Sequence, residues 1–386
     1  MAKKKVSRPL QSAAPAETDI LKLPAELRYR DELDALAAAD SGPVPPGWKL
    51  SPRMVRTFLL GPSSADPAAA KLPPIKRKFH GDDPLVERAI VTLMSNRGLL
   101  FVGEPGTAKS MLSELLAAAI SGSSSLTIQG SAGTTEDQIK YSWNYALLLA
   151  EGPTPRAMVP APLFQGLTQG AIVRFEEITR CAPEIQDVLI SVLSDKVLHV
   201  PELQGTETTL YARPGFNIIA TANTRDRGVH EMSSALKRRF NFETVKPIAD
   251  RQFELELVME QARELLNSAQ APVEMPVDAI DVLVTTFSDL RRGRTEDGTT
   301  IDRPTTIMST AEAVSVVFAA GLDAYYYGKG EIQGEHLSRQ LTGTVLKDSP
   351  EDGKKVRHYF DVVVKPRAQH SKHWKSFFAG RGGLGE

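Results

Sequence analysis

The sequence feature that most constrains the fold is an apolar strand that runs into a glycine-rich turn and then a helix, at residues 99–121. The turn reads Gly-Glu-Pro-Gly-Thr-Ala-Lys-Ser and ends in Lys109 and Ser110, where the helix begins. Gly103 and Gly106 let the backbone N–H groups point inward, toward an anion at the positive end of the helix dipole. Lys109 adds a mobile charge for phosphates, and Ser110 adds a hydroxyl ligand for Mg²⁺. The pattern predicts a phosphate-binding loop, against the alternative of an ordinary strand, turn and helix.

One position in this loop departs from the common form, because Ala108 stands before the lysine where glycine is usual. We expect the alanine to be tolerated, on the assumption that this residue already has helical dihedral angles. The predicted nucleotide-binding residues are Gly103, Glu104, Pro105, Gly106, Thr107, Ala108, Lys109, Ser110 and Met111.

The overall composition restricts the class of protein. The chain has 386 residues, of which 41% are hydrophobic and 24% charged, as expected for a soluble globular protein of more than one domain. A formal net charge of −1 gives no general attraction to nucleic acid or to an anionic membrane. No apolar run is long enough to span a bilayer. The single cysteine, Cys181, excludes a disulfide framework within one chain. We therefore expect a cytoplasmic protein with no membrane or nucleic-acid partner.

The order of predicted elements divides the chain into four regions. Residues 1–79 form an N-terminal extension, partly disordered, in which residues 19–40 can make one amphipathic helix. Alternating strands and helices at 80–248 predict an α/β core, 249–348 a separate all-helical domain, and 349–386 a basic tail with interleaved aromatic residues. The expected core strands are 99–102, 126–129, 171–175, 216–222 and 242–245, with a hairpin at 197–200 and 208–212. The expected helices include 109–121, 183–194, 251–268, 277–291, 305–326 and 335–346.

Two adjacent carboxylates, Glu176 and Glu177, follow a short apolar strand and supply what a phosphate loop lacks for hydrolysis. Glu176 is expected to face Mg²⁺ through water, although it is one methylene longer than the usual Asp. Glu177 can polarise the attacking water, because adjacent residues at a strand end point in different directions. A solvated strand end is the alternative interpretation of the pair. Asn223 ends a neighbouring strand at the same sheet edge and can reach the γ-phosphate, although such an asparagine is more often a turn residue.

Two arginines, Arg238 and Arg239, follow a short predicted helix. The charge that develops on a transferring phosphoryl group needs a cation beyond Lys109, and arginine is suited to that task. Because Arg239 lies too far along the core to fold back onto its own site, we expect it to act on a neighbouring subunit, which implies a ring. The alternative is that these residues form a solvated basic turn.

Taken in order, four motifs resemble those of AAA+ ATPases: Gly-Glu-Pro-Gly-Thr-Ala-Lys-Ser, Arg-Phe-Glu-Glu-Ile, Ile-Ala-Thr-Ala-Asn-Thr and Lys-Arg-Arg-Phe. Within these proteins, residues 80–345 look most similar to the MoxR family, relatives of the magnesium-chelatase ATPase subunit. The resemblance implies a five-stranded parallel sheet in the order 5-1-4-3-2, followed by a small all-helical lid domain. The resemblance assigns Lys109 and Ser110 to Walker A, and Glu176 and Glu177 to Walker B. It assigns Asn223 to sensor 1 and Arg239, assisted by Arg238, to the arginine finger.

The same resemblance gives further expectations. Members of the family carry a helical insert and a hairpin where this chain has residues 131–170 and 197–212. Their sensor 2 is an arginine near the start of a lid helix, for which Arg303 is the nearest candidate in this sequence.

The resemblance implies an ATPase that uses Mg²⁺, assembles as a ring, expected to be a hexamer, and remodels partner proteins as a chaperone does. The expected partner carries a von Willebrand A domain. Glu176 in place of aspartate favours an alternative, a nucleotide-dependent scaffold that hydrolyses little ATP. A small-molecule kinase is a second alternative, but such an enzyme has no need of the sensor strand, the arginine pair or the helical lid.

Overall fold

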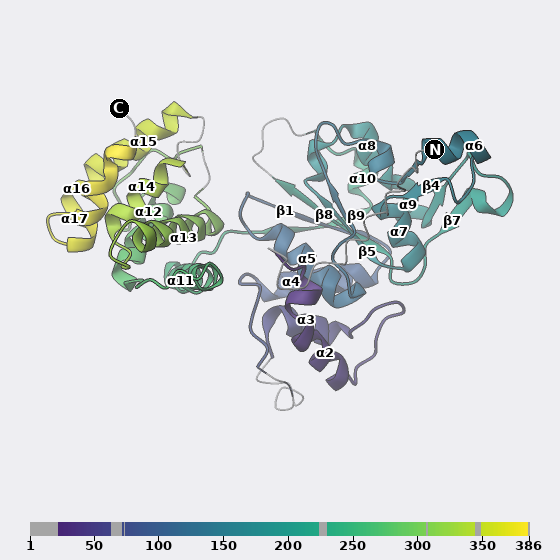
Figure 1. The fold of residues 1–386 in the computed structure, drawn as a ribbon, viewed down its shortest axis with the longest axis horizontal. Helices are drawn as coiled ribbons and strands as arrows, with labels where there is room; N and C mark the ends of the chain where they lie inside the picture. The colour runs from purple at the N-terminus through teal and green to yellow at the C-terminus, as the bar shows by residue number, and fades with distance from the viewer. Residues whose placement is uncertain are drawn as a thin grey trace, which may run out of the picture.

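The computed structural model describes residues 22–62, 72, 74–223, 230–305, 308–343 and 349–384. These residues form two lobes, an α/β core and a helical domain (Figure 1). One segment of chain joins the last core strand to the first helix of the helical domain (Figure 1). Among the described residues, no helix combines the length and the apolar character needed to cross a membrane.

A five-stranded parallel sheet forms the centre of the core. Its strands are β1 (Gly98–Gly103), β2 (Thr127–Gln129), β5 (Ile172–Glu176), β8 (Asn217–Asn223) and β9 (Phe240–Val245). They lie in the order β2-β5-β8-β1-β9, and every neighbouring pair is parallel, which confirms the predicted 5-1-4-3-2 arrangement. Gly103 pairs with Asn223 on one side and Val245 on the other, so the glycine-rich loop begins level with the carboxyl ends of both neighbours.

Helices cover both faces of this sheet (Figure 1). One face carries α4 (Asp83–Met94) and α5 (Lys109–Ser121), and the other carries α7 (Pro162–Gln169), α8 (Pro183–Asp187), α9 (Leu189–Asp195) and α10 (Ser234–Lys237). Side chains alternate along a strand, so Leu99 and Phe101 pack toward α4 and α5, whereas Leu100 packs toward the opposite face. The bounds of α5 coincide with the prediction, but the helix expected at 183–194 is interrupted at Val188.

Much of the predicted N-terminal extension is an ordered part of the core. Its helices are α1 (Ala25–Arg28), α2 (Arg30–Ala39) and α3 (Pro52–Leu60). Leu36 and Phe58 are fully buried in the same cluster as residues of α4 and α5. The single helix expected at 19–40 is divided in two by Tyr29, whose φ of −115° and ψ of 27° leave the helical region. Residues 1–21, including the start of that predicted helix, lie outside the described residues.

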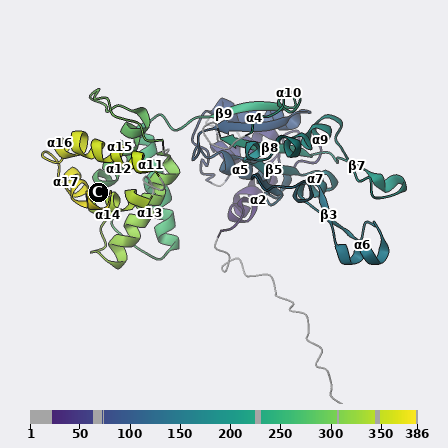
Figure 2. The same ribbon diagram turned by 90° about the horizontal axis from the view of Figure 1, so that it is seen from above.

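Two arms project from the core, away from the helical domain (Figure 2). The helical arm comprises β3 (Tyr141–Trp143), α6 (Tyr145–Glu151) and β4 (Met158–Pro160), preceded by η3 (Glu136–Gln138). The hairpin arm comprises β6 (Val197–His199), η5 (Gly205–Thr208) and β7 (Thr209–Tyr211), and it confirms the predicted hairpin. The Tyr141 hydroxyl of β3 donates a hydrogen bond of 2.8 Å to Glu202, in the connection between β6 and β7, and so joins the two arms.

The helical domain includes the segment that was expected to be a separate tail. Its elements are α11 (Arg251–Ser268), α12 (Val277–Arg292), α13 (Thr310–Tyr326), α14 (Gly334–Leu341), α15 (Pro350–Tyr359), η7 (Phe360–Val364), α16 (Lys365–Arg367), α17 (Lys372–Ala379) and η8 (Gly380–Leu384). Tyr359, Phe360 and Phe377 are almost completely buried and join the same hydrophobic cluster as α12 and α13. These three aromatic residues therefore belong to the interior of this domain and not to a tail, and Trp374 and Phe378 pack against this cluster partly buried.

Candidate nucleotide site

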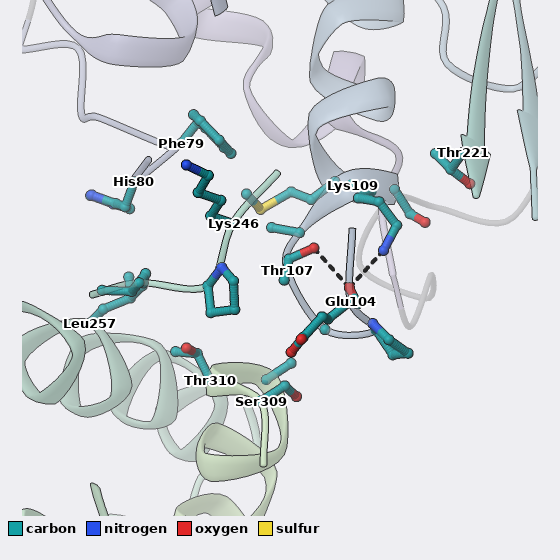
Figure 3. A pocket seen from close by; sticks show the side chains of 18 of the residues that line it. Phe79, His80, Glu104, Thr107, Lys109, Thr221, Lys246, Leu257, Ser309 and Thr310 are labelled. Carbon is teal, nitrogen blue, oxygen red and sulfur yellow. Dashed lines mark hydrogen bonds between the residues drawn. The ribbon is translucent and has the colours of Figure 1, made fainter. Parts of the chain in front are cut away.

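A cavity of about 380 Å³ lies between the core and the helical domain (Figure 3). The core contributes the glycine-rich loop, the ends of β5 and β8 and the 78–80 segment, and the helical domain contributes α11, α12 and the start of α13. The lining residues are Lys78, Phe79, His80, Glu104, Pro105, Gly106, Thr107, Ala108, Lys109, Ser110, Met111, Glu177, Thr221, Asn223, Lys246, Pro247, Ile248, Leu257, Gln261, Arg291, Ser309, Thr310 and Ala311. Gly103 is absent from this lining set and forms the base of the loop at the end of β1.

Only glycine fits at position 106, because of both its backbone conformation and the atoms around it. Its φ is +74°, a region that L side chains rarely adopt. A Cβ atom at this position would lie 2.2 Å from the Cβ of Ser309, the residue that caps α13. The glycine-rich loop and the helical domain therefore meet at this point, where the cavity is closed by α13.

Ala108 has a left-handed backbone, with φ of 66° and ψ of 21°. The expectation that it has ordinary helical dihedrals is wrong, because the chain must turn sharply here before α5 begins. The left-handed region costs an alanine about 1–2 kcal/mol, whereas glycine adopts it freely. The alanine thus stores local strain at the loop, beside Lys109.

This strain predicts that an alanine-to-glycine substitution has different effects on stability at two positions. Ala108→Gly should leave the free energy of unfolding unchanged or raise it by up to about 1 kcal/mol, because relief of strain exceeds the added entropy of the unfolded chain. Ala118→Gly, inside α5, should lower it by about 1 kcal/mol. Urea denaturation without nucleotide measures both. An equal loss at both positions would contradict the strain at Ala108.

Lys109 is buried at the floor of the cavity, with 6% of its surface exposed. Its ammonium donates hydrogen bonds to the backbone oxygens of Gly103, at 3.1 Å, and Glu104, at 2.7 Å. Thr107 donates to the same Glu104 oxygen at 2.8 Å (Figure 3). The loop is therefore folded around the lysine, and phosphate oxygens could take over these contacts from the carbonyl groups.

Glu176 does not line the cavity but lies beneath it, only 5% exposed, against the start of α5. Its Oε2 accepts hydrogen bonds from the hydroxyls of Ser110, at 2.7 Å, and Thr221, at 2.8 Å. Its Oε1 accepts from Ser113, at 2.6 Å, and from the Arg174 guanidinium, at 2.9 Å. Burial alone would raise the pKa of the Glu176 carboxyl, but these hydrogen bonds and the charge of Arg174 outweigh it and hold the pKa below its ordinary value.

This arrangement fits a divalent cation. The Ser110 hydroxyl and the ionised Glu176 carboxylate touch one another at the cavity floor, and both are oxygen ligands of the kind that Mg²⁺ prefers. Ser113 and Arg174 occupy the other carboxylate oxygen, so Oε2 is the one that faces Ser110. Within the described ranges, no group of three or more His, Cys, Asp or Glu side chains is arranged as a metal site. A Mg²⁺ ion here would therefore take its remaining ligands from phosphate and water.

Glu177 reaches the cavity itself, with a left-handed backbone at φ 54° and ψ 44°. Its N–H donates to the Thr221 hydroxyl at 3.0 Å, and its carboxylate forms an ion pair of 2.7 Å with Arg180 in η4 (Ile178–Arg180). The turn separates this carboxylate from that of Glu176, as the sequence predicts for adjacent residues at a strand end. Asn223 also lines the cavity, beside Gly103 at the end of β1.

Arg238 and Arg239 lie just before β9, at the amino ends of the strands, whereas the glycine-rich loop lies at the carboxyl ends. The backbone oxygen of Arg239 accepts a hydrogen bond from the N–H of Gly98, the first residue of β1. The glycine-rich loop leaves the other end of that strand, about 16 Å away at about 3.3 Å per residue. The Arg239 guanidinium bonds to Ser194 and, at 2.6 Å, to the Ala235 oxygen, and neither arginine is part of the cavity lining.

Arg303 is not brought to the cavity. It lies exposed in the loop before α13, with its side chain against Gly293. The helical domain instead presents Arg291 of α12 to the cavity. Arg291 forms a bidentate ion pair with the buried Glu254, at 2.6 and 3.0 Å, and donates to the Met308 oxygen at 2.9 Å. This correction has a physical reason: the ion pair with Glu254 orients Arg291 inward, whereas Arg303 lies in an exposed loop and forms no ion pair with any other described residue.

Sequence reasoning missed several cavity residues besides Arg291. Lys246 follows β9 in the segment that joins the two lobes, and Thr221 sits two residues before Asn223 on β8. The period of two along a strand was a usable signal for Thr221, because it places that side chain on the same face as Asn223. Lys78, Phe79 and the start of α13 offered no local signal, since their position depends on how distant elements pack.

Comparison with known proteins agrees with this geometry. A model described as an AAA domain of the dynein-related subfamily matches residues 98–240, and one described as a YehL-like AAA+ ATPase C-terminal domain matches residues 252–385. The protein YehL of Escherichia coli (strain K12) is 50% identical over 369 residues, which cover 95% of this chain and 99% of YehL. The chain belongs to the YehL-like family of AAA+ ATPases. The C-terminal match runs through α15 to α17, in line with their place in the helical domain.

Two weaker similarities each cover part of this YehL-like chain. The gas vesicle ATPase GvpN2 of Halobacterium salinarum is 34% identical over 82 residues, which cover 21% of this chain and 24% of that protein. A solved structure of NtrX from Brucella abortus in complex with ADP has a TM-score of 0.47 and 14% identity, covering 78% of this chain and 64% of that one. The YehL-like chain thus spans less than two thirds of that solved chain.

Proposed function

We propose that this YehL-like protein hydrolyses ATP as a subunit of a MoxR-type ring and uses the energy to remodel a partner protein. The observation that carries the proposal is the convergence of Lys109, Ser110, Glu177 and Asn223, from three separate elements, on one cavity that the helical domain closes. A cavity at the carboxyl ends of parallel strands is where α/β proteins bind ligands.

Each residue has a chemical task under this proposal. Lys109 binds the β- and γ-phosphates, and Ser110 and Glu176 hold Mg²⁺, whose charge stabilises the phosphate oxygens. Glu177 orients and polarises the attacking water, and Asn223 contacts the γ-phosphate or that water. The anionic Glu176 suits this task, since its hydrogen bonds favour the charged form.

The position of Arg239 supports assembly into a ring. Because it lies at the edge of the sheet opposite its own glycine-rich loop, it can complete a site only on a neighbouring subunit. A head-to-tail contact of this kind closes into a ring when the rotation per subunit permits. The MoxR resemblance favours six subunits.

The two arms support action on a partner protein. Tyr145 and Leu149 of the helical arm are 71% and 89% exposed, and Tyr211 of the hairpin arm is 71% exposed. No residue of α6 is buried, although the helix reads Tyr-Ala-Leu-Leu-Leu-Ala-Glu. Exposed apolar side chains of this kind mark contact sites. Under the proposal they meet the client, for which the MoxR resemblance favours a protein with a von Willebrand A domain.

The test measures ATP turnover and assembly on the same purified chain, with Mg²⁺ and ATP, by phosphate release and light scattering. Lys109→Ala should lower turnover at least about a hundredfold, because the lysine charge at the phosphates is lost. Lys354→Ala, at an exposed lysine of α15, is the matched control and should change nothing. Full turnover by a single-chain species, or by the Lys109→Ala variant, would overturn the proposal.

A second candidate, a nucleotide-dependent scaffold with little hydrolysis, is favoured by one observation. Glu176 stands where aspartate is usual, and its carboxylate is already held by four donors, among them the Arg174 guanidinium. A scaffold would bind ATP and assemble while phosphate release stayed at the level of the Lys109→Ala variant.

A further inference from the structure

The wall of the cavity that faces the glycine-rich loop is formed by a segment that precedes α4. Phe79 and His80 lie across the cavity from the side chain of Lys109 (Figure 3). Phosphates bound at Lys109 would leave the base of a nucleotide to extend toward this side. The surroundings suit a flat, mostly apolar ring, since Pro247, Ile248 and Leu257 line the cavity as well.

The segment that forms this wall, residues 76–80, contacts the N-terminal helices on the side away from the cavity. The N–H groups of Lys78 and Phe79 both donate to the oxygen of Leu59, the penultimate residue of α3, at 2.9 and 3.0 Å. Because these two hydrogen bonds fix one side of the segment and the cavity lies on the other, α3 sets the position of the segment's backbone. The shape of the wall therefore depends on α2 and α3, which lie before the residues matched by both family models.

The strongest link is the side chain of Lys78, of which only 4% is exposed. Its ammonium forms an ion pair with Glu32 of α2 and donates to the oxygens of Phe58, at 3.0 Å, and Lys76, at 3.1 Å. It also lies over the rings of Tyr29 and Phe58, 4.7 and 4.3 Å from their centroids. A buried ammonium that lost Glu32 would be a costly unpaired charge, so the segment would have to move to release it.

The segment also contacts the helical domain. The ring of His80 packs on Phe253 of α11, with centroids 4.9 Å apart, and the Lys76 ammonium lies 3.3 Å from Glu260 of the same helix. The Nδ1 atom of His80 is buried without a hydrogen-bond partner among the described residues. Both lobes thus meet at this wall, where a polar group of a base could satisfy that nitrogen.

We infer that Glu32 and Lys78 are positioning residues for the base of the bound nucleotide, through which the N-terminal helices set the affinity for ATP. The inference rests on the proposed function, since it requires that ATP occupies this cavity with its phosphates at Lys109. It assigns the N-terminal helices a part in the nucleotide site, without direct contact between Glu32 and the nucleotide.

The experiment compares two probes on the full chain by isothermal titration calorimetry: ATP, and inorganic tripolyphosphate, which lacks the base. Glu32→Ala and Lys78→Met should each raise the Kd for ATP about five- to tenfold, as expected for loss of one charge-assisted contact. The Kd for tripolyphosphate should stay within about twofold, because the glycine-rich loop is intact. The double variant should bind ATP no more weakly than the weaker single variant, since both changes break one contact.

The matched control is Glu26→Ala, which acts on the same helical unit away from the cavity. Glu26 of α1 accepts hydrogen bonds from the N–H and hydroxyl of Ser124, at 3.1 and 2.7 Å. This variant should lower the melting temperature without changing the Kd for ATP. If Lys78→Met does not fold, Glu32→Ala decides, because the Glu32 side chain is 23% exposed and its loss leaves no cavity.

The outcomes separate the inference from the function on which it rests. Three results would overturn the positioning role alone. The first is an equal rise in the Kd values for ATP and tripolyphosphate, and the second is an unchanged Kd for ATP in folded Glu32→Ala. The third is an equal rise in the Kd for ATP in the control Glu26→Ala. A wild-type chain that bound neither probe would overturn the proposed function.

Discussion

Replacing Glu177 by glutamine is expected to lower ATP turnover by about two to three orders of magnitude and to leave the affinity for ATP within about twofold. Glutamine keeps the size of the side chain but cannot accept a proton from the attacking water. The backbone N–H bond to Thr221 and the left-handed turn do not depend on the carboxylate, so the cavity keeps its shape. Single-turnover phosphate release and equilibrium ATP binding measure the two quantities separately.

Glu184→Gln is the matched control for this prediction, because it is the same change at an exposed position in the first turn of α8. It should leave turnover and binding unaltered. Unchanged turnover in Glu177→Gln would remove Glu177 from the mechanism, and a parallel loss of ATP binding would assign it to the shape of the cavity. The same variant, held in its ATP-bound state, is the form with which to capture the client.

The sequence predicted the core well because its decisive patterns are local. Each buried strand is a short apolar run, and the phosphate loop depends on residues that follow one another between β1 and α5. The order of the strands followed from the resemblance, and the pairing of Gly103 with Asn223 and Val245 confirms it. Lys109, Ser110, Glu177 and Asn223 gather at one cavity for the same reason, since each ends or follows a strand or lies in the first turn of a helix beside one.

The features that the sequence did not predict depend on tertiary packing. Arg291 lies in α12 and Arg303 in the loop before α13, and the ion pair with buried Glu254 directs Arg291 toward the cavity. The aromatic residues of 349–386 have the spacing of an exposed tail, but the rings of Phe360 and Phe377 stack in the interior with centroids 5.1 Å apart. Ala108 is left-handed because the loop needs that turn, against the preference of the residue.

Mixing two inactive variants is expected to restore ATP hydrolysis. Arg239→Ala should lower turnover about a thousandfold, by removing the transition-state cation, and Lys109→Ala should lower it by removing phosphate binding. In a ring with random placement of an equal mixture, about one quarter of the sites combine an intact Lys109 with an intact Arg239 from the neighbour. Turnover per chain should then reach about one quarter of the wild-type value.

The expected rescue follows from the positions of Arg239 and the glycine-rich loop at opposite ends of β1. Arg239 lies beside Gly98 and the glycine-rich loop lies beyond Gly103, so the length of β1 separates the arginine from its own phosphates. The control mixture pairs Arg239→Ala with the double variant Lys109→Ala/Arg239→Ala, which supplies no intact arginine and should restore nothing. Absence of rescue at every mixing ratio, in variants that still assemble, would show that Arg239 does not act across an interface. The contacts of its guanidinium with Ser194 and Ala235 would then be its whole role, as a support for α9 and α10.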